Sequence, residues 1–546
     1  MDSATKRIDM KILLVYPKMP YAFWSMHHVL KVAGKTANYP PVGLLTIAAM
    51  LPEEWEKRLI DLNLDTPLTD RDIEWADYVF IGAMNVQATS VRQIIDQCQK
   101  SSAKIVAGGP LFTHEYKDFP GVDHFVLNEA ELTLPRFLKD LEAGCAKPVY
   151  LTPEMANVHE TPIPLWELAD MKKYGFAIVQ YSRGCPYMCE FCDVTALFGR
   201  KPRTKTPEQI IAELESLGDI DQYDLVVFAD DNLIGNKKVL KQELLPALIE
   251  WRKQKNRLVG FATQLTINLA DDDELMQMML EAGFRHIFVG IETPDEDSLI
   301  AIKKGQNARR NMLDNVKKLH RNGFIVTAGF IVGLDTDTPD IFQKQIDFIQ
   351  DSGIVVAGVS VLKAPPGTEL YNRMKREGRL VYQFDFHESQ TNIIPNMDVD
   401  VLSAGYRRIL EYICSPKYVY ERARNFLIEY NAHKVSYDAD FKFSHVPIMV
   451  RYFGVFLRMI YHVGLRGEQR VYFWKLVSWA WKNKRENLDL AIFFGIWMKE
   501  FHNMFQNYEA SGHFDIYKVS MSLANQQHSD IAAKKLTAVA INAVGQ

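Results

Sequence analysis

The sequence is poor in cysteine, and this scarcity narrows the class of protein that it can encode. Its 546 residues include six cysteines, three of which fall between positions 185 and 192. A disulfide framework would use more cysteines and distribute them along the chain. We therefore expect a cytoplasmic protein in a reducing compartment, in which Cys98, Cys145 and Cys414 are ordinary core or surface residues.

Two further absences exclude other classes of protein. The formal net charge is −5, whereas a protein that binds nucleic acid usually carries a basic excess. No run of about 18 consecutive apolar residues is present. The apolar run that follows the polar first ten residues is also too short for the core of a signal peptide. We therefore expect no nucleic-acid partner, no membrane-spanning helix and no secretion signal.

Strands and helices alternate in residues 1–145, which we predict to form one domain. Such alternation is typical of a parallel, doubly wound sheet, which binds ligands beyond the carboxyl ends of its strands. Helices are expected at 40–52, where prolines open the segment, and at 90–101, where the pattern is amphipathic. The expected strands are 11–17, 56–63, 76–84, 103–110 and 123–129.

A second alternating series occupies residues 177–375 and predicts a parallel barrel, full or partial. The proline-rich stretch before it, 146–176, is predicted to be an irregular linker. The expected barrel strands are 177–182, 225–230, 259–265, 286–292, 325–333 and 355–362, and the expected helices are 207–217, 273–283, 310–323 and 339–353.

Residues 376–520 have a mostly helical pattern and many aromatic side chains, with arginine and lysine between them. One interpretation is an apolar wall that admits a lipid-like or macrocyclic substrate to the barrel. A second is an amphipathic face that makes peripheral contact with a membrane. A third is an ordinary helical cap, which aromatic residues at helical spacing indicate most often. The last segment, 521–546, has the composition of a disordered tail.

The three clustered cysteines form a motif with a specific spacing. Cys185, Cys189 and Cys192 follow the pattern C-x3-C-x2-C directly after the first expected barrel strand. Thiolates favour iron–sulfur clusters or zinc, but a structural zinc site closes with four ligands and no fourth cysteine lies nearby. Three thiolates on a 4Fe–4S cluster leave one iron open to another ligand. The alternatives are a zinc knuckle and chance clustering.

This motif, at the end of a first barrel strand, resembles the signature of the radical S-adenosylmethionine (SAM) superfamily. The resemblance implies that the three cysteines bind a 4Fe–4S cluster and that SAM binds its open iron. Reductive cleavage of SAM would then give a 5′-deoxyadenosyl radical, with electrons from a donor such as flavodoxin or ferredoxin. The residues that the resemblance places against SAM are Asp230, Asp231, Asn232, Glu292, Gly329 and Gly333.

Each of these SAM positions also has a plainer interpretation. The segment Asp230–Asn232 ends the second barrel strand and could cap the helix that follows. A lone carboxylate such as Glu292 at a strand end is often only solvated. Gly329 and Gly333 lie in the fifth strand, where glycine can serve close packing as well as a ligand.

A doubly wound domain directly before such a barrel resembles the cobalamin-binding class of the superfamily. The D-x-H-x-x-G motif, whose histidine ligates cobalt in that class, is absent here. His27 and His28 follow the first strand, but we expect them on a helix surface. The domain could therefore hold cobalamin without a protein ligand to cobalt, or it could have lost the cofactor. The residues that the resemblance places near cobalamin are Met84, Thr89, Ser90, Gly108, Gly109 and Glu129.

The resemblance extends over almost the whole chain to a subgroup with an aromatic C-terminal extension, which includes the hopanoid C-2 methylase and bacteriochlorophyllide side-chain methylases. It is carried by Phe23-Trp24 and by the segments 39–49, 52–55 and 391–395. It implies a cobalamin-dependent C-methyltransferase that acts on an unactivated carbon of a hydrophobic, lipid- or tetrapyrrole-like substrate. Two alternatives remain: a radical SAM enzyme that catalyses cyclisation, rearrangement or oxidation beside a vestigial first domain, and a non-catalytic cobalamin or iron–sulfur sensor.

Overall fold

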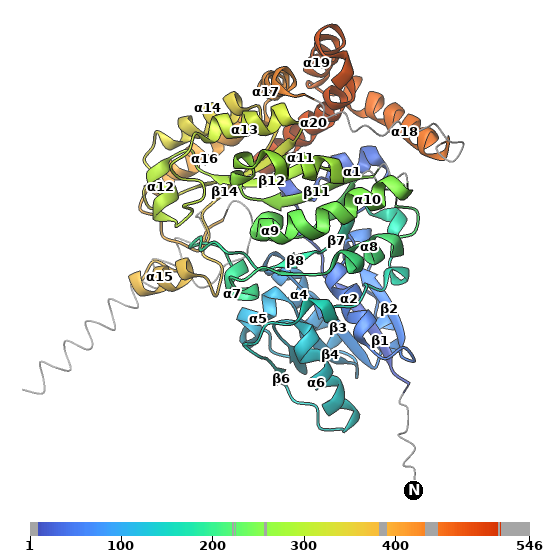
Figure 1. Cartoon of the computed structure of the whole chain (residues 1–546). Coiled ribbons are helices and arrows are strands. Elements are labelled where there is room, and N and C mark those ends of the chain that lie inside the picture. Colours follow the sequence, from blue (N-terminus) through green and yellow to red (C-terminus); the bar gives the residue numbers. More distant parts are fainter. Residues whose placement is uncertain are drawn as a thin grey trace, which may run out of the picture.

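The computed structural model contains two α/β regions, a first domain and a barrel domain, followed by a group of C-terminal helices (Figure 1). This is the order that the sequence predicts. The predicted disordered tail, 521–546, lies outside the residues that the structure describes. The described residues are 9–220, 223, 225–255, 259–381, 390–431, 446–511 and 514.

The first sheet has six parallel strands in the order β2–β1–β3–β4–β5–β6. The order reverses at β1, which places a crevice at the carboxyl ends of β1 and β3. All five expected strands are confirmed. The structure adds β6 within the predicted linker; the sequence did not predict it because a two-residue strand is too short to show a sequence period. The bounds are β1 Lys11–Tyr16, β2 Glu56–Asp61, β3 Tyr78–Gly82, β4 Lys104–Gly108, β5 His124–Val126 and β6 Val149–Tyr150.

Helices cover both faces of this sheet. The middle of strand β1 is apolar because Leu13 and Val15 enter one core while Ile12 and Leu14 enter the other. The first core includes residues of α3, α4 and α5, and the second includes residues of α2 and α6. The bounds are α1 His27–Ala33, α2 Val42–Met50, α3 Asp70–Trp75, α4 Ala88–Cys98, α5 Pro110–Glu115 and α6 Ala130–Glu142.

The barrel sheet also has six parallel strands, in the order β14–β13–β12–β11–β10–β7, with β14 and β7 at its edges. It is therefore a partial barrel, and all six expected strands are confirmed. A short antiparallel pair, β8 Ser182–Arg183 and β9 Arg203–Thr204, flanks the cysteine motif. The strand bounds are β7 Ala177–Val179, β10 Leu225–Phe228, β11 Gly260–Leu265, β12 Phe284–Glu292, β13 Ile325–Val332 and β14 Val356–Val361.

The inner face of the barrel sheet is accessible, whereas its outer face is packed. In β12, Ile287, Val289 and Ile291 are buried, but the alternate positions Phe288 and Gly290 are half-exposed. The strands β11, β13 and β14 show similar alternation. The bounds of the helices in this domain are α7 Val194–Phe198, α8 Pro207–Ser216, α9 Lys237–Val239, α10 Leu245–Lys255, α11 Asp273–Ala282, α12 Glu296–Ala301, α13 Met312–Asn322, α14 Ile341–Ser352 and α15 Glu369–Glu377.

In the described residues 390–431 and 446–511, the C-terminal group consists of α16 Val399–Cys414, α17 Pro416–Glu429, α18 Val446–Met459, α19 Arg470–Asn483 and α20 Leu488–Ala510. Helices α16 and α17 pack on α14, and α20 packs on α16, α17 and α19, which supports a helical cap for these elements. Among the described helices, none is both long and apolar enough to cross a membrane.

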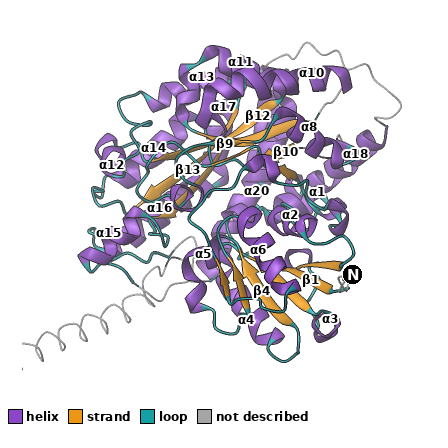
Figure 2. Ribbon diagram, turned by 60° about the horizontal axis from the view of Figure 1, so that its bottom comes forward, coloured by secondary structure: helices purple, strands orange, loops and turns teal. Residues whose placement is uncertain are grey.

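The first domain packs against the rest of the chain at several points (Figure 2). Helix α1 packs against α18 and α20, and the Glu500 carboxylate of α20 accepts hydrogen bonds from the backbone amides of His28 and Val29 at 2.7 and 3.0 Å. At the end of β2, Asp61 accepts a hydrogen bond of 2.8 Å from the hydroxyl of Tyr174, which precedes β7. His27 and His28 therefore begin a helix held by the C-terminal group.

Candidate active site

The three cysteines lie in a loop between β8 and α7, just beyond the carboxyl end of β7. All three thiols are free and half-buried. Gly184, which precedes the loop, has a φ of +95°, and a Cβ there would lie 3.0 Å from the carbonyl oxygens of Phe198, Gly199 and Lys201. A side chain at position 184 would thus displace the cysteine loop. The sequence correctly predicts where this loop lies; Cys98 and Cys414 are buried and Cys145 is exposed, as expected.

A cavity of about 200 Å³ opens beside the loop. It is lined by Met188, Cys189, Cys192, Thr195, Ala196, Arg200, Gly367, Thr368 and Glu369. Among the described residues, no three His, Cys, Asp or Glu side chains converge on a single point as ligands to one ion would. Ligands to a cluster each bind a different iron and need not converge, so this arrangement fits a cluster and lends no support to a zinc knuckle.

Polar groups surround the thiols. Burial raises the pKa of Cys192 to about 12 and also raises the pKa of Cys185, so binding of iron would have to displace their protons. The Asn232 amide nitrogen lies 3.9 Å from the Cys185 sulfur, and the Gln306 amide nitrogen lies 3.5 Å from the Cys189 sulfur. Sequence reasoning missed Gln306, because nothing in its segment forms a motif.

Asp230 and Asp231, predicted to contact SAM, hold the cysteine loop. Asp230 is buried and accepts hydrogen bonds from the backbone and hydroxyl of Ser182, and burial raises its pKa to about 7. Asp231 accepts a hydrogen bond of 3.0 Å from the Gly184 amide. Asn232 differs from both, because its side-chain oxygen is buried without a partner among the described residues and does not cap the helix that follows. A buried free acceptor beside the cysteines fits the amine of a bound SAM.

Glu292, the fourth-strand carboxylate predicted to contact SAM, is an ion-pair partner of Lys304. Both side chains are buried, and Glu292 has a φ of +67° at the end of β12. Burial alone would lower the pKa of Lys304, but Glu292 and the nearby Cys189 and Cys192 raise it. A protonated lysine therefore lies close to Cys189 and Cys192, two of the cysteines predicted to bind the cluster. Glu292 is not the solvated carboxylate of the plainer interpretation.

The two glycines predicted to lie against SAM have close protein neighbours. A Cβ at Gly329 would lie 3.0 Å from the Phe288 ring. Gly333 has a φ of +85°, and a Cβ there would lie 3.1 Å from Leu402 of α16. Close packing thus accounts for glycine at both positions, although Gly329 remains on the accessible inner face of the barrel.

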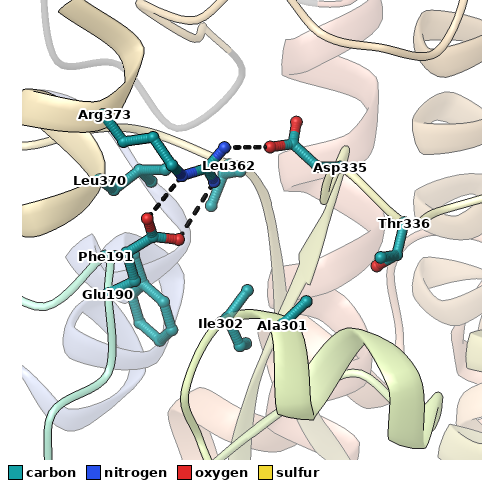
Figure 3. A pocket seen from close by; sticks show the side chains of 9 residues that line it. All are labelled: Glu190, Phe191, Ala301, Ile302, Asp335, Thr336, Leu362, Leu370 and Arg373. Atoms are coloured by element: carbon teal, nitrogen blue, oxygen red, sulfur yellow. Dashed lines mark hydrogen bonds and ion pairs between the residues drawn. The ribbon is translucent and has the colours of Figure 1, made fainter. Parts of the chain in front are cut away.

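A small cavity of about 20 Å³ lies behind the cysteine loop (Figure 3). Arg373 of α15 pairs with both carboxylate oxygens of Glu190, at 2.6 and 3.1 Å, and with Asp335 at 2.6 Å. Arg379 also reaches Asp335 at 2.6 Å. Because Glu190 follows Cys189 directly, these ion pairs tie the cysteine loop to the segments after β13 and β14.

The residues predicted to contact cobalamin occupy varied environments. Met84 is exposed at the end of β3, and the Ser90 hydroxyl accepts a hydrogen bond of 2.9 Å from the Lys18 amide in the loop after β1. A Cβ at Gly108 would lie 2.6 Å from the Val126 carbonyl oxygen, and one at Gly109 would lie 2.9 Å from that of Ala83. The packing of β4 against its neighbours therefore requires these glycines. Thr89 is the second residue of α4, lies beside Ser90 in the chain and is exposed.

Glu129 joins the two domains. Its carboxylate, 4% exposed as a residue, pairs with Arg183 of β8 and Arg203 of β9, each at 2.9 Å. Arg183 also pairs with Glu131 at 2.8 Å. Through these contacts Glu129 holds the strand pair that leads into the cysteine loop, and its contact with cobalamin stays a prediction.

A second contact brings the first domain to the cysteine cavity. His114 of α5 lies against Gly367, because a Cβ at Gly367 would lie 2.5 Å from the His114 ring. Gly367 lines the same cavity as Cys189 and Cys192. The carboxyl edge of the first sheet and the cysteine loop therefore border the same region.

Large apolar side chains are exposed along this edge. Met19 and Tyr21 follow β1, and Met84 and Val86 follow β3. Trp24, also after β1, reaches the inner face of the barrel, where its ring lies 5.3 Å from that of Phe288. Exposed apolar groups gathered around the crevice of a doubly wound sheet are suited to a flat or apolar ligand.

Comparison with known proteins agrees with this geometry. Residues 31–138 match the B12 binding domain, 179–349 match the Radical SAM superfamily, and 368–512 match a domain of unknown function, DUF4070. The chain is 33% identical to the hopanoid C-2 methylase of Rhodopseudomonas palustris, over 87% of this chain and 90% of that protein. It is 38% identical to an uncharacterized methyltransferase of Synechocystis, over 73% and 75% of the two chains.

The fold is also found in a solved structure. That of the cobalamin-dependent S-adenosylmethionine radical enzyme OxsB matches with a TM-score of 0.58 at 15% identity, over 96% of this chain and 84% of that one. The sequence matches show that the chain belongs to the radical SAM superfamily, in the class with an N-terminal B12-binding domain. It is an enzyme, and this class uses a 4Fe–4S cluster, SAM and cobalamin.

Proposed function

We propose that this enzyme is a cobalamin-dependent C-methyltransferase that acts on an unactivated carbon of a hydrophobic substrate. The observation that carries the proposal is the position of the cysteine loop, which Glu129 of the first domain holds through Arg183 and Arg203. His114 adds a contact of that domain with the wall of the cysteine cavity. A methyl carrier on the first sheet and a radical source on the barrel would thus face one region.

The chain's own residues would divide the work of binding and positioning. When bound, the cluster and SAM supply a 5′-deoxyadenosyl radical, and cobalamin supplies a methyl group. Cys185, Cys189 and Cys192 would hold the cluster, and the free oxygen of Asn232 would accept a hydrogen bond from SAM. Asp230 and Asp231 would act on the loop, because their carboxylates are already bonded to its backbone.

We further propose that exposed apolar side chains hold the remaining ligands. Met84 would contact cobalamin, with Thr89, Ser90, Gly108 and Gly109 shaping the loops behind it. Trp24 and Phe288 would contact the substrate on the accessible face of the barrel. Relatives named hopanoid C-2 methylase and bacteriochlorophyllide d C-12(1)-methyltransferase support a lipid- or tetrapyrrole-like substrate. The electron donor would be a flavodoxin or ferredoxin.

The proposal is tested by reconstituting the protein anaerobically with iron, sulfide and hydroxocobalamin. We expect a bound corrinoid and, with reductant, SAM and substrate, both S-adenosylhomocysteine and 5′-deoxyadenosine. Cys189→Ala should lose 5′-deoxyadenosine formation, whereas Cys145→Ala, an exposed cysteine outside the site, should not. Formation of 5′-deoxyadenosine without S-adenosylhomocysteine or bound corrinoid would instead support a non-methylating radical enzyme with a vestigial first domain.

A further inference from the structure

The C-terminal helices expose an apolar surface on elements that do not contribute to the candidate active site. On α18 and the turn that continues it, η13 (Ile460–Gly464), exposed side chains recur at helical spacing, and Phe453 is 62% exposed. On α19 the exposed rings are seven positions apart and share one side of the helix. We call this surface the aromatic–basic face; its apolar members are Phe453, Phe456, Leu457, Tyr461, Trp474 and Trp481.

The two helices contribute to one continuous surface. The Trp474 ring nitrogen donates a hydrogen bond of 2.9 Å to the carbonyl oxygen of Gly464, the last residue of η13. Figure 1 shows α18 and α19 at the opposite end of the molecule from the first sheet. Ordinary cap helices bury such rings, as α20 buries Phe494, Phe501 and Trp497. Packing as a helical cap accounts for the buried side of α19 but not for the exposed rings of α18 and α19.

Basic side chains lie among the exposed rings. Arg466 stands over the Tyr461 ring at 4.2 Å and Arg485 over the Trp481 ring at 4.1 Å. Lys475 and Lys482 directly follow Trp474 and Trp481, are both exposed, and share one side of α19 with each other. Between 453 and 485 the basic residues are Arg458, Arg466, Arg470, Lys475, Lys482, Lys484 and Arg485, and the acidic residue is Glu468. This local excess contrasts with the net charge of −5 for the whole chain.

We infer that the aromatic–basic face docks the enzyme on the surface of an anionic lipid membrane. Aromatic and aliphatic side chains flanked by lysine and arginine are the side-chain set of interfacial helices, which lie in the plane of the lipid surface. A second copy of this chain is a poorer occupant, because its own basic residues would meet those of the first copy. The inference does not rest on the proposed methylation.

The full-length protein tests this inference in vesicle flotation, with phosphatidylcholine alone or mixed with phosphatidylglycerol. We expect flotation with the anionic vesicles that decreases as salt is added. Lys475→Gln/Lys482→Gln should weaken binding roughly 25-fold, since each basic residue near the surface is worth roughly a factor of five. Phe453→Ser/Leu457→Ser should weaken it roughly tenfold or more, by removing inserted apolar area.

Matched pairs elsewhere on the surface are the controls: Lys139→Gln/Lys253→Gln for charge and Leu151→Ser/Ile300→Ser for apolar exposure. Both should bind like the wild type. Wild-type protein that binds neither vesicle overturns the inference, as does equal binding by the face variants and the controls. Self-association that Phe453→Ser/Leu457→Ser abolishes, without vesicle binding, would assign the face to a second copy. The salt dependence is measured on the wild-type protein, so this part of the test stands even if a variant fails to fold.

Discussion

Replacing Glu129 with glutamine should loosen the cysteine loop, although Glu129 belongs to the first domain. The change keeps the size of the side chain and removes the charge that Arg183 and Arg203 share. Breaking a buried ion pair costs about 3–5 kcal/mol. Arg183 keeps Glu131, and Arg203 keeps the carbonyl oxygens of Ala156 and Phe198, so we expect the lower end, about 3 kcal/mol.

This loss is measurable by hydrogen–deuterium exchange of the peptide that spans 181–192. A local opening that costs about 3 kcal/mol less free energy exchanges roughly 150-fold faster, and the iron content after reconstitution should fall with it. Glu131→Gln is the matched control, because Glu131 bonds Arg183 but not Arg203. Exchange in Glu129→Gln that is no faster than in Glu131→Gln or the wild type would refute the assignment of Glu129 as the residue that joins the domains.

Three further predictions concern other residues. Gln306→Leu should lower the midpoint potential of the cluster, because hydrogen bonds to the cysteine sulfurs favour the reduced cluster. A redox titration followed by electron paramagnetic resonance measures this potential, and an unchanged value would contradict the prediction. Trp24→Ala should raise KM roughly tenfold with a smaller change in kcat, since about 1.5–3 kcal/mol accompanies full burial of a large apolar side chain; an unchanged KM would exclude Trp24 from the substrate site. His320 is buried, neither ring nitrogen has a hydrogen-bond partner in the described part of the chain, and burial lowers its pKa to about 3. Neutral His320 therefore contributes stability above about pH 6.5, and this contribution is lost as the pH falls toward 3. Between pH 7 and 5 the wild type should lose about 2 kcal/mol of unfolding free energy relative to His320→Phe. Equal pH dependence of the two proteins in urea denaturation would refute this.

The sequence predicts elements well where one physical signal dominates. Apolar runs such as Ile12–Val15 identify buried parallel strands, and strand ends locate Asn232 and the cysteines at one edge of the barrel. The two-residue strand β6 carries no such signal. The sequence also predicts Gly108 and Gly109 but not why glycine is needed there. The atoms that a Cβ would crowd belong to neighbouring segments of the sheet.

Long-range partners could not be predicted from the sequence. Gln306 is 117 positions from Cys189, and Glu129 is 54 positions from Arg183. Which side chains meet depends on how separately formed segments pack, and no local pattern encodes it. Glu129 was therefore predicted as a cofactor contact from its place in the first domain, whereas the structure pairs it with two arginines of the barrel domain.

The central claim, methyl transfer to carbon by radical chemistry, is tested most directly with SAM carrying a deuterated methyl group. The reconstituted enzyme, a reductant and a hydrophobic substrate of the hopanoid or tetrapyrrole class should yield a product that contains the intact labelled methyl group. S-adenosylhomocysteine and 5′-deoxyadenosine should form in equal amounts with that product. A converted substrate without the label would contradict the account, whatever the amount of 5′-deoxyadenosine formed.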